Sequence, residues 1–349
     1  MIVIPPVAIT DSLLVSSTAF EVAPAAYNSG TTYALGAFAS VAGSAGLITV
    51  YKSLQNGNLN KTPASNPSWW AYHCDTYQQY SGGTTYALGD VVIDATAHKV
   101  YESLAASNTG NALTDATKWL HTGTTNKWAM FDFDRSIGTS QASPLVVSFT
   151  PGERIDSIAI LGVVGTSVQV DMEVSASVVY TRTASMTGRE TLSWSDYFFG
   201  NFDQNPSLLL TDLPPFANAT VTVTITGSSV SCGACVVGRA INIGEVQYGA
   251  TNDALNFSRI ERDDFGNGTL NRRKIVPKTN QTLFFEKSMT NKVIAVRKSL
   301  NAAPAVWSGL VDTGDGYFDA LLILGIYKQF EVSLKEPSHG TLNLELEEM

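Results

Sequence analysis

The chain is poor in charged residues. Only 15% of its 349 residues are Asp, Glu, Lys or Arg, against about 25% in an average soluble protein. The charge that is present is mostly acidic, with a formal net charge of -9 and a pI of about 4.9. Because binding to nucleic acid depends on clustered Lys and Arg, this composition excludes nucleic acid as the main partner. Ser, Thr, Asn and Gly fill the polar positions instead, which suits β-rich proteins and surfaces covered by neighbouring subunits.

Long apolar runs and a basic leader are missing as well. No run approaches the roughly 18 apolar residues of a membrane-spanning helix, and the longest candidate, "ALLILGIY" from Ala320, has the length of a buried strand. The opening "MIVIPPVAITDSLL" has no basic segment, and Pro5-Pro6 interrupts what would be the apolar part of a secretion signal. We therefore expect no membrane insertion and no export through a signal peptide.

Three cysteines and four histidines leave little material for a metal site. Cys232 and Cys235 form a C-x-x-C pair, but a structural zinc site uses four ligands, commonly two such pairs. His73-Cys74 is the further pair that would complete a set. The stretch "VSCGACVVGRAINIG" around the C-x-x-C pair is instead typical of a buried strand and turn. The sequence predicts no metal and no cofactor.

Catalytic patterns are scarce too. The chain contains no G-x-S-x-G, no H-E-x-x-H and no Walker loop. A glycosidase needs two carboxylates that face each other across a cleft. Asp132 and Asp134 lie two apart and would share one face of a strand, which is also how an ordinary polar strand face looks. The other candidates are Asp312, Asp315 and Asp319. We expect that the protein is not an enzyme.

The front of the chain repeats itself. "YALGAFASVAGSAGLITVYKSL" begins at Tyr33, and "YALGDVVIDATAHKVYESL" begins 53 residues later at Tyr86. Two further aromatic pairs are 50 residues apart, and a three-residue deletion in the "SVAGSAG" loop reconciles the offsets. This predicts two copies of one small β-module. We expect aromatic side chains to form each core, namely Tyr33, Tyr51 and Trp69 in the first copy and Tyr86, Tyr101 and Trp119 in the second.

The rest of the chain favours a mainly β fold. Segments such as "PLVVSFTP", "IDSIAILGVVG" and "ATVTVTITG" are β-branched, often alternating, and punctuated by Gly, Pro and Asn, which predicts an antiparallel, jelly-roll-like β-sandwich. The expected units are an N-terminal arm (1–26), repeat 1 (27–76), repeat 2 (77–124), the β-sandwich (125–248) and a C-terminal α+β domain (249–349).

The C-terminal domain combines a hairpin with a helix. "FSRIERDDFGNGTLNRRKIVP" predicts a long charged hairpin that turns at residues 266–268. One apolar stripe at helical spacing follows, formed by Phe285, Met289, Val293, Val296 and Leu300. The hairpin mixes both signs of charge in a chain that is otherwise poor in charge. Either this is a solvated face, or Arg262, Asp264, Arg272 and Arg273 set the register against a neighbouring subunit.

The second repeat resembles a family. Tyr86-x-x-Gly89-Asp90-x-Val92, followed by Tyr101 and Trp119, is similar to the Y-x-x-G-D-x-V … Y … W pattern of the small chitin- and carbohydrate-binding modules on secreted glycoside hydrolases. Such modules also occur in bacteriophage tail proteins. The first copy departs from the pattern, because Ala37 replaces the Asp.

The resemblance implies a sugar-binding face made of exposed aromatic residues. Trp69 and Trp119 align and are expected in the core, which leaves Trp70 and Tyr72 in the first repeat, with His121 in the second, as the carbohydrate-binding candidates. The alternative is that Trp70 packs between the repeats or against a neighbouring subunit.

A second resemblance covers the remaining chain. The stretches "FDFDRSIGTSQ", "IDSIAILG" and "VGRAINIGEVQYGA" resemble the lectin-like sandwich domains of phage tail-tip and baseplate proteins, and the ending is similar to the closing segment of such virion proteins. This implies a structural component of a long-tailed phage, assembled in the host cytoplasm into the virion tail. Its partners would be other tail proteins, further copies of itself in a ring around the tail axis, and host surface polysaccharide. The alternative is a free carbohydrate-binding protein or an accessory module of a polysaccharide-degrading enzyme.

Overall fold

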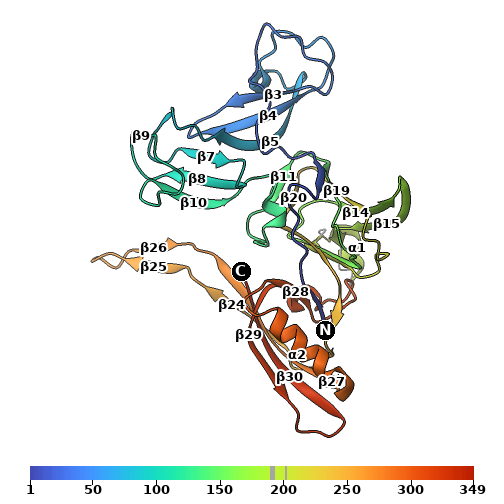
Figure 1. Cartoon of the computed structure of the whole chain (residues 1–349). Coiled ribbons are helices and arrows are strands. Elements are labelled where there is room, and N and C mark those ends of the chain that lie inside the picture. The colour runs from blue at the N-terminus through green and yellow to red at the C-terminus, as the bar shows by residue number, and fades with distance from the viewer. Residues whose placement is uncertain (189–192, 201–202) are drawn as a thin grey trace.

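The computed structural model describes residues 1–188, 193–200 and 203–349. These residues form thirty strands and two α-helices, so the predicted mainly β class is confirmed. Figure 1 shows the N-terminal repeats in blue and cyan at one end, the green strands in the middle and the orange and red sheet at the other end. No helix in the described part of the chain is long and apolar enough to cross a membrane.

The two repeats share one six-stranded sheet of order β10-β8-β7-β5-β4-β3. Its strands are β3 (Phe38–Ala42), β4 (Leu47–Ser53), β5 (Trp70–Gln79), β7 (Val91–Asp94), β8 (Lys99–Ser103) and β10 (Trp119–Thr124), with the short pair β6 (Thr85–Tyr86) and β9 (Asn108–Thr109) beside it. The sheet is continuous because the end of β5 pairs in parallel with β7, Gln78 opposite Val92. The boundary predicted between residues 76 and 77 therefore falls inside β5.

The middle body is a sandwich of two antiparallel sheets. One has the order β15-β14-β19-β12-β2 and the other β18-β13-β21. Their bounds are β2 (Leu14–Ser17), β12 (Leu145–Phe149), β13 (Ser157–Leu161), β14 (Ser167–Val174), β15 (Ser177–Ser185), β18 (Ser207–Leu210), β19 (Thr220–Thr226) and β21 (Ala234–Gly238). Along β19 every second residue is buried, as expected for a strand with one face on a core. Val221, Val223 and Ile225 of that strand lie in a core shared with both sheets.

Short pieces complete this body: β11 (Thr139–Gln141) pairs with β20 (Val230–Cys232), and β16 (Thr187–Gly188) pairs with β17 (Asp203–Gln204). Helix α1 (Trp194–Phe199) lies between β16 and β17 in the chain.

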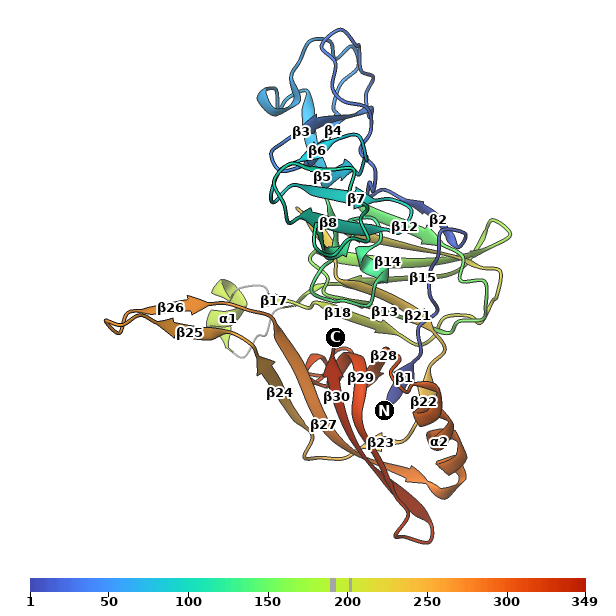
Figure 2. The same cartoon turned by 60° about the vertical axis from the view of Figure 1, so that its left-hand side comes forward.

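The three-stranded sheet is buried on both faces. Every residue of β13, β18 and β21 is buried. Ile158 and Ile160 of β13 face the sandwich core, whereas Ala159 and Leu161 face a second core shared with the C-terminal sheet. Figure 2 shows these strands between the five-stranded sheet of the sandwich and the C-terminal sheet. The sandwich and the C-terminal domain are thus successive layers joined through an apolar interior.

The C-terminal sheet has the order β22-β1-β28-β29-β30-β27-β23, and β24 also pairs with β27. The strands are β1 (Ile2–Ile4), β22 (Ile241–Asn242), β23 (Glu245–Val246), β24 (Thr251–Asn256), β27 (Ile275–Glu286), β28 (Ala305–Ser308), β29 (Leu322–Ser333) and β30 (His339–Glu348). Helix α2 (Thr290–Ser299) covers one face, with Val293 and Val296 in the core. The predicted helical stripe began too early, because Phe285 lies in β27 and reaches the same core from the sheet.

The N-terminal segment connects the C-terminal sheet, the sandwich and the repeats. Its first strand, β1, lies between β22 and β28 in the C-terminal sheet, and β2 pairs with β12 in the sandwich. Glu21 then contacts the second repeat. The predicted arm therefore contributes one strand to the C-terminal sheet and one strand to the sandwich.

The predicted charged hairpin is present as a projecting arm. β25 (Arg259–Arg262) pairs with β26 (Gly268–Asn271), and the turn closes where Asp263 accepts the Asn267 backbone N–H at 2.8 Å. Figures 1 and 2 both show this hairpin extending away from the C-terminal sheet. Every residue of β24 and β25 is exposed.

Candidate functional site

Each repeat is built on the same cluster of three aromatic rings. In repeat 1, Tyr33 meets Trp70 edge-on with ring centroids 5.0 Å apart and lies parallel to Tyr27 at 5.8 Å. In repeat 2, Tyr86 meets Trp119 at 5.3 Å and lies parallel to Tyr80 at 6.0 Å. Edge-to-face and offset parallel pairs are the favourable arrangements of aromatic rings. The clusters therefore stabilise two modules that contain few other apolar residues.

The prediction that Trp69 is the core tryptophan is wrong. Trp70 is 2% exposed, and its indole N–H donates to the Lys61 carbonyl at 2.7 Å. Trp119 is also 2% exposed and donates in the same way to the Asn111 carbonyl at 3.1 Å. Trp70 is thus the counterpart of Trp119 and is not available to a sugar. Trp69 lies half-buried at the surface, with the Lys61 ammonium 5.6 Å from its ring centroid.

A buried polar clip, which sequence reasoning missed, is the same in both repeats. Asn58 Nδ2 donates to Ser53 Oγ at 3.0 Å and to the Trp69 carbonyl at 3.3 Å. In repeat 2, Asn108 Nδ2 donates to Ser103 Oγ at 3.0 Å and to the Lys118 carbonyl at 3.1 Å. Each clip fixes a long polar loop against the strand that carries the tryptophan. The signal was present in the sequence, since both copies read Ser-Leu followed four residues later by Asn.

Sequence reasoning also missed Tyr27 and Tyr80 as core residues. They are 53 residues apart, the same offset as Tyr33 and Tyr86. In both copies the tyrosine follows a parallel backbone pairing: Ala26 opposite Ser40, and Gln79 opposite Ile93. Repeat 1 therefore begins at the end of the N-terminal segment, and repeat 2 begins at the end of β5.

Two of the predicted sugar-binding residues occupy equivalent positions. Tyr72 pairs across β4 and β5 with Tyr51, and His121 pairs across β8 and β10 with Tyr101. The His121 and Tyr101 rings are 5.5 Å apart. Tyr72 is 47% exposed and His121 is also exposed, so each repeat presents one exposed ring beside a half-buried tyrosine. We call these two pairs the outer aromatic pairs.

Tyr72 is held by a carboxylate. Its hydroxyl donates to Asp75 Oδ2 at 3.3 Å. Partial burial, and then the negative charge of Asp75, raise the pKa of Tyr72 to about 12. The hydroxyl is therefore a neutral group at physiological pH.

The repeats are joined by the tips of their hairpins. In the β3–β4 turn of repeat 1, the Ala45 carbonyl accepts the Val91 N–H at 3.0 Å and the Gly46 carbonyl accepts the Gln78 N–H at 2.9 Å. Gly46 has a φ of +79°, and a Cβ on it would lie 2.1 Å from the Val91 carbonyl oxygen. The Gly/Ala-rich insertion of repeat 1 is therefore in contact with the second repeat, beside the β5–β7 pairing.

The corresponding turn of repeat 2, between β7 and β8, contacts the N-terminal segment and Trp128. His98 has a positive φ of 56°. Its imidazole lies 2.8 Å from Glu21 Oε1 and 3.1 Å from Asp11 Oδ2, and it stacks on the Trp128 ring at 4.2 Å. The Glu21 carboxylate also accepts the Thr125 hydroxyl at 2.8 Å and the Trp128 indole N–H at 3.1 Å. The nearly buried Glu21 carboxylate thus connects repeat 2 to the N-terminal segment and to Thr125 and Trp128.

The predicted docking residues all lie on the exposed arm. Arg262, Asp264, Arg272 and Arg273 are exposed, and Arg262 donates to the Gly266 carbonyl of its own turn at 3.4 Å. Apolar side chains accompany them: Phe265 is 90% exposed, and Ile260 pairs across the hairpin with the equally exposed Leu270. The arm therefore presents both charge and apolar surface.

The candidate acid pair forms a turn. Asp132 and Asp134 follow the 3-10 turn Ala129–Phe131 and are not on a strand. Asp132 Oδ1 accepts the Asp134 N–H at 2.8 Å, and Asp134 Oδ1 accepts the Ser136 hydroxyl at 2.6 Å. Burial raises the pKa of Asp132. At Asp134 burial acts in the same direction, but hydrogen bonds from Ser136 and Lys274 bring its pKa below the usual value. Both carboxylates thus accept hydrogen bonds within this turn, and Asp134 also binds the Lys274 ammonium at 3.1 Å.

The cysteines are buried as free thiols. Cys232 lies on β20 and Cys235 on β21. Burial raises the pKa of Cys232 to about 12, which opposes formation of the thiolate that a metal requires. Across the described residues, no group of three or more His, Cys, Asp or Glu side chains is placed to hold a metal ion.

Comparison with known protein families, curated proteins and solved structures gives no match to this chain.

Proposed function

We propose that the chain is a non-enzymatic structural component of the tail tip or baseplate of a long-tailed bacteriophage. It assembles in the host cytoplasm with other tail proteins, as a ring of copies around the tail axis, and its N-terminal repeats touch host surface glycan. The exposed arm carries this proposal, because a hairpin with large apolar side chains in solvent is typical of a surface that a partner covers.

The placement of the parts supports the same function. The arm projects sideways from the C-terminal sheet, whereas the repeats lie on the opposite side of the sandwich from that sheet (Figure 1). Shared apolar cores join the sandwich to the C-terminal sheet, and polar contacts of His98 and His73 join the repeats to the N-terminal segment. The arm is thus suited to fixing the protein in an assembly and the repeats to outward contact. The mixed charge of the arm would set the register of docking rather than supply its bulk free energy.

The test compares assembly with an intact and an altered arm. Sedimentation and native mass spectrometry of the full chain give its oligomeric state, and complementation of a phage that lacks the protein gives incorporation into tails. We expect Arg272→Glu with Arg273→Glu, and separately Phe265→Ser with Ile260→Ser, to reduce both. The control is Lys292→Glu with Lys298→Glu, which makes the same charge change on the exposed side of α2.

The proposal is wrong if both arm variants complement the phage as well as the control does. A chain that stays monomeric, does not enter tails and still binds glycan would instead be a free carbohydrate-binding protein.

A further inference from the structure

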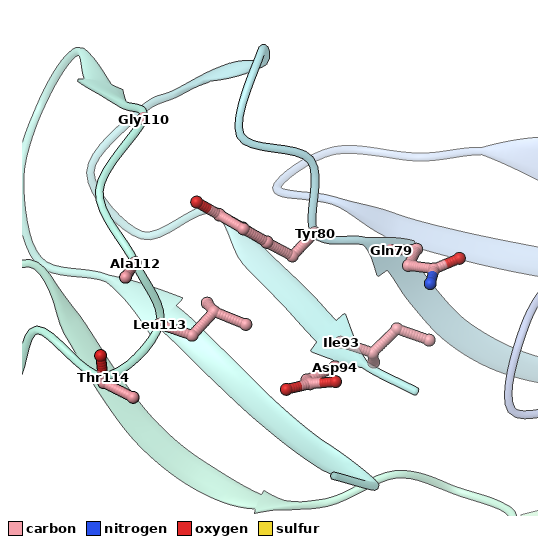
Figure 3. A pocket seen from close by; sticks show the side chains of 8 residues that line it. All are labelled: Gln79, Tyr80, Ile93, Asp94, Gly110, Ala112, Leu113 and Thr114. Carbon is pink, nitrogen blue, oxygen red and sulfur yellow. The ribbon is translucent and has the colours of Figure 1, made fainter. Parts of the chain in front are cut away.

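Repeat 2 contains a hollow that is separate from the outer aromatic pairs. Its volume is about 420 Å³, and it lies where the end of β5 meets β7 and the loop at residues 110–114. Figure 3 shows Tyr80, Leu113 and Ile93 around it, with the carboxylate of Asp94 beside Ile93. Gln79 and Thr114 supply further polar groups at its rim.

Two polar side chains of this hollow, Asp94 and Tyr80, are fixed by hydrogen bonds. Asp94 Oδ1 accepts the backbone N–H groups of Thr96 at 3.0 Å and Ala97 at 3.2 Å, which fixes the carboxylate. Among the described residues, no hydrogen bond or ion pair reaches Asp94 Oδ2. The Tyr80 hydroxyl donates to the Asn111 carbonyl at 2.7 Å, so this ring is fixed as well. The hollow thus combines the fixed ring of Tyr80 with a carboxylate oxygen, Asp94 Oδ2, that can accept further hydrogen bonds.

Repeat 1 provides an internal comparison. The parallel pairing Ala26 with Ser40 corresponds to Gln79 with Ile93, so Val41 stands where repeat 2 has Asp94. Asn60 stands where repeat 2 has Gly110, and both have a positive φ. The aromatic cluster and the buried clip are the same in the two copies, while the residues around the hollow differ. The differences at Gln79 and Gly110 are therefore not needed for the fold of the module, whereas Asp94 caps the β7–β8 turn, which is longer in repeat 1.

We propose that this hollow is a subsite for one neutral pyranose unit of a surface polysaccharide, which rests on the proposal that the repeats contact glycan. The apolar face of the sugar lies against Tyr80 and Leu113. Two of its hydroxyls donate to Asp94, and Gln79 pairs with a third. A carboxylate accepts hydrogen bonds and repels anions, so the subsite excludes uronic and sialic acid units. Binding is confined to repeat 2.

The test measures binding of tetrasaccharides of glucose, galactose and N-acetylglucosamine to the full chain by calorimetry, with a tetrasaccharide of galacturonic acid as the anionic probe. Two variants place repeat 1 residues in the hollow: Gln79→Ala with Asp94→Val, and Gly110→Asn. Circular dichroism and thermal unfolding verify that both variants fold, and Gly110→Asn leaves the turn that Asp94 caps intact. Tyr72→Ala with His121→Ala tests the outer aromatic pairs separately, and Lys292→Glu with Lys298→Glu on α2, away from the repeats, is the control.

We expect at least one neutral tetrasaccharide to bind, both hollow variants to weaken it by at least about tenfold, and the control to change its affinity less than about twofold. Loss of binding in the Tyr72→Ala with His121→Ala variant but not in the hollow variants would overturn this subsite and leave glycan contact by the repeats standing. Preference for the anionic probe would overturn the subsite as well. No binding of any tetrasaccharide by the folded wild-type chain would overturn the subsite together with glycan contact.

Discussion

His98 Nδ1 lies 2.8 Å from Glu21 Oε1, and this contact joins the second repeat to the N-terminal segment. Glu21 is nearly buried, and it receives two further hydrogen bonds, from Thr125 and Trp128. A buried carboxylate is tolerated only when it is well hydrogen-bonded. Repeat 2 is therefore joined to the N-terminal segment by polar contacts around one side chain, and repeat 1 reaches the same segment through His73, whose imidazole lies 3.0 Å from the Thr18 carbonyl.

Removing this carboxylate should loosen the repeats without unfolding them. Glu21→Ala leaves the Thr125 hydroxyl and the Trp128 indole N–H without their acceptor, and His98 loses its inner partner. We expect a destabilisation of about 1–3 kcal/mol, concentrated at the junction. Hydrogen exchange should accelerate in residues 95–98 and 125–128 and stay unchanged in the aromatic clusters. Asp11→Ala is the control, because Asp11 is mostly exposed and an exposed ion pair contributes about 0–1 kcal/mol. Equal effects of the two variants would contradict this account.

The two neighbouring tryptophans of repeat 1 should differ sharply. Trp70→Ala removes a buried ring and its hydrogen bond to the Lys61 carbonyl, and truncating a buried aromatic residue costs about 3–5 kcal/mol. Trp69→Ala removes a half-buried surface ring and should cost less than about 1 kcal/mol. Chemical unfolding followed by far-ultraviolet circular dichroism compares the variants, with Trp119→Ala as the matched variant of repeat 2. A larger effect of Trp69→Ala would restore the alignment expected from the sequence.

Gly46→Ala tests the contact between the repeats. The positive φ is unfavourable for alanine, and the new Cβ would meet the Val91 carbonyl oxygen, so we expect a loss of at least about 2 kcal/mol. Gly36→Ala is the control, since Gly36 has a similar φ of +83° but no atom within 4 Å of the added Cβ. It should cost about 1 kcal/mol. Thermal unfolding of both variants gives the comparison, and indistinguishable midpoints would contradict the proposed close approach.

The thiols should be unreactive in the folded protein. Burial raises the pKa of Cys74 from 9.0 to about 11 and that of Cys232 to about 12. A disulfide reagent at pH 8 should therefore label no thiol in the native chain and all three in denaturant. The unfolded thiols ionise above about pH 9, whereas the folded thiols stay protonated. The contribution of the buried thiols to stability is therefore present below pH 9 and falls as the pH rises towards 11. Rapid labelling of the native chain would contradict this burial.

The duplication was visible in the sequence, but its residue-level alignment was not. Tyr33 with Tyr86 and Tyr51 with Tyr101 carry recognisable flanking residues. Trp69 was paired with Trp119 because a single offset of 50 served both pairs, whereas the counterpart of Trp119 is Trp70, one residue further along. The polar loops before the tryptophans differ by one residue, and periodicity in such loops is too weak to reveal a deletion. Hydrogen bonds to loop carbonyls decided the alignment.

The helix was misplaced for a related reason. Phe285, Met289 and Val293 have helical spacing, yet Phe285 belongs to a twelve-residue strand. Both elements bury their apolar residues in one core, so the apolar spacing continues across the junction although the backbone changes. The membership of residues 2–4 in the last sheet was equally invisible, because strand pairing across more than 300 residues leaves no local pattern.

The hairpin-tip contacts have a consequence for how firmly the repeats are held. The turn of repeat 1 is hydrogen-bonded to repeat 2, and the turn of repeat 2 contacts Glu21 of the N-terminal segment. Repeat 1 contacts that segment as well, through His73 in β5. The two repeats and the N-terminal segment therefore form a closed ring of contacts, so that the loss of one contact leaves each repeat attached through another.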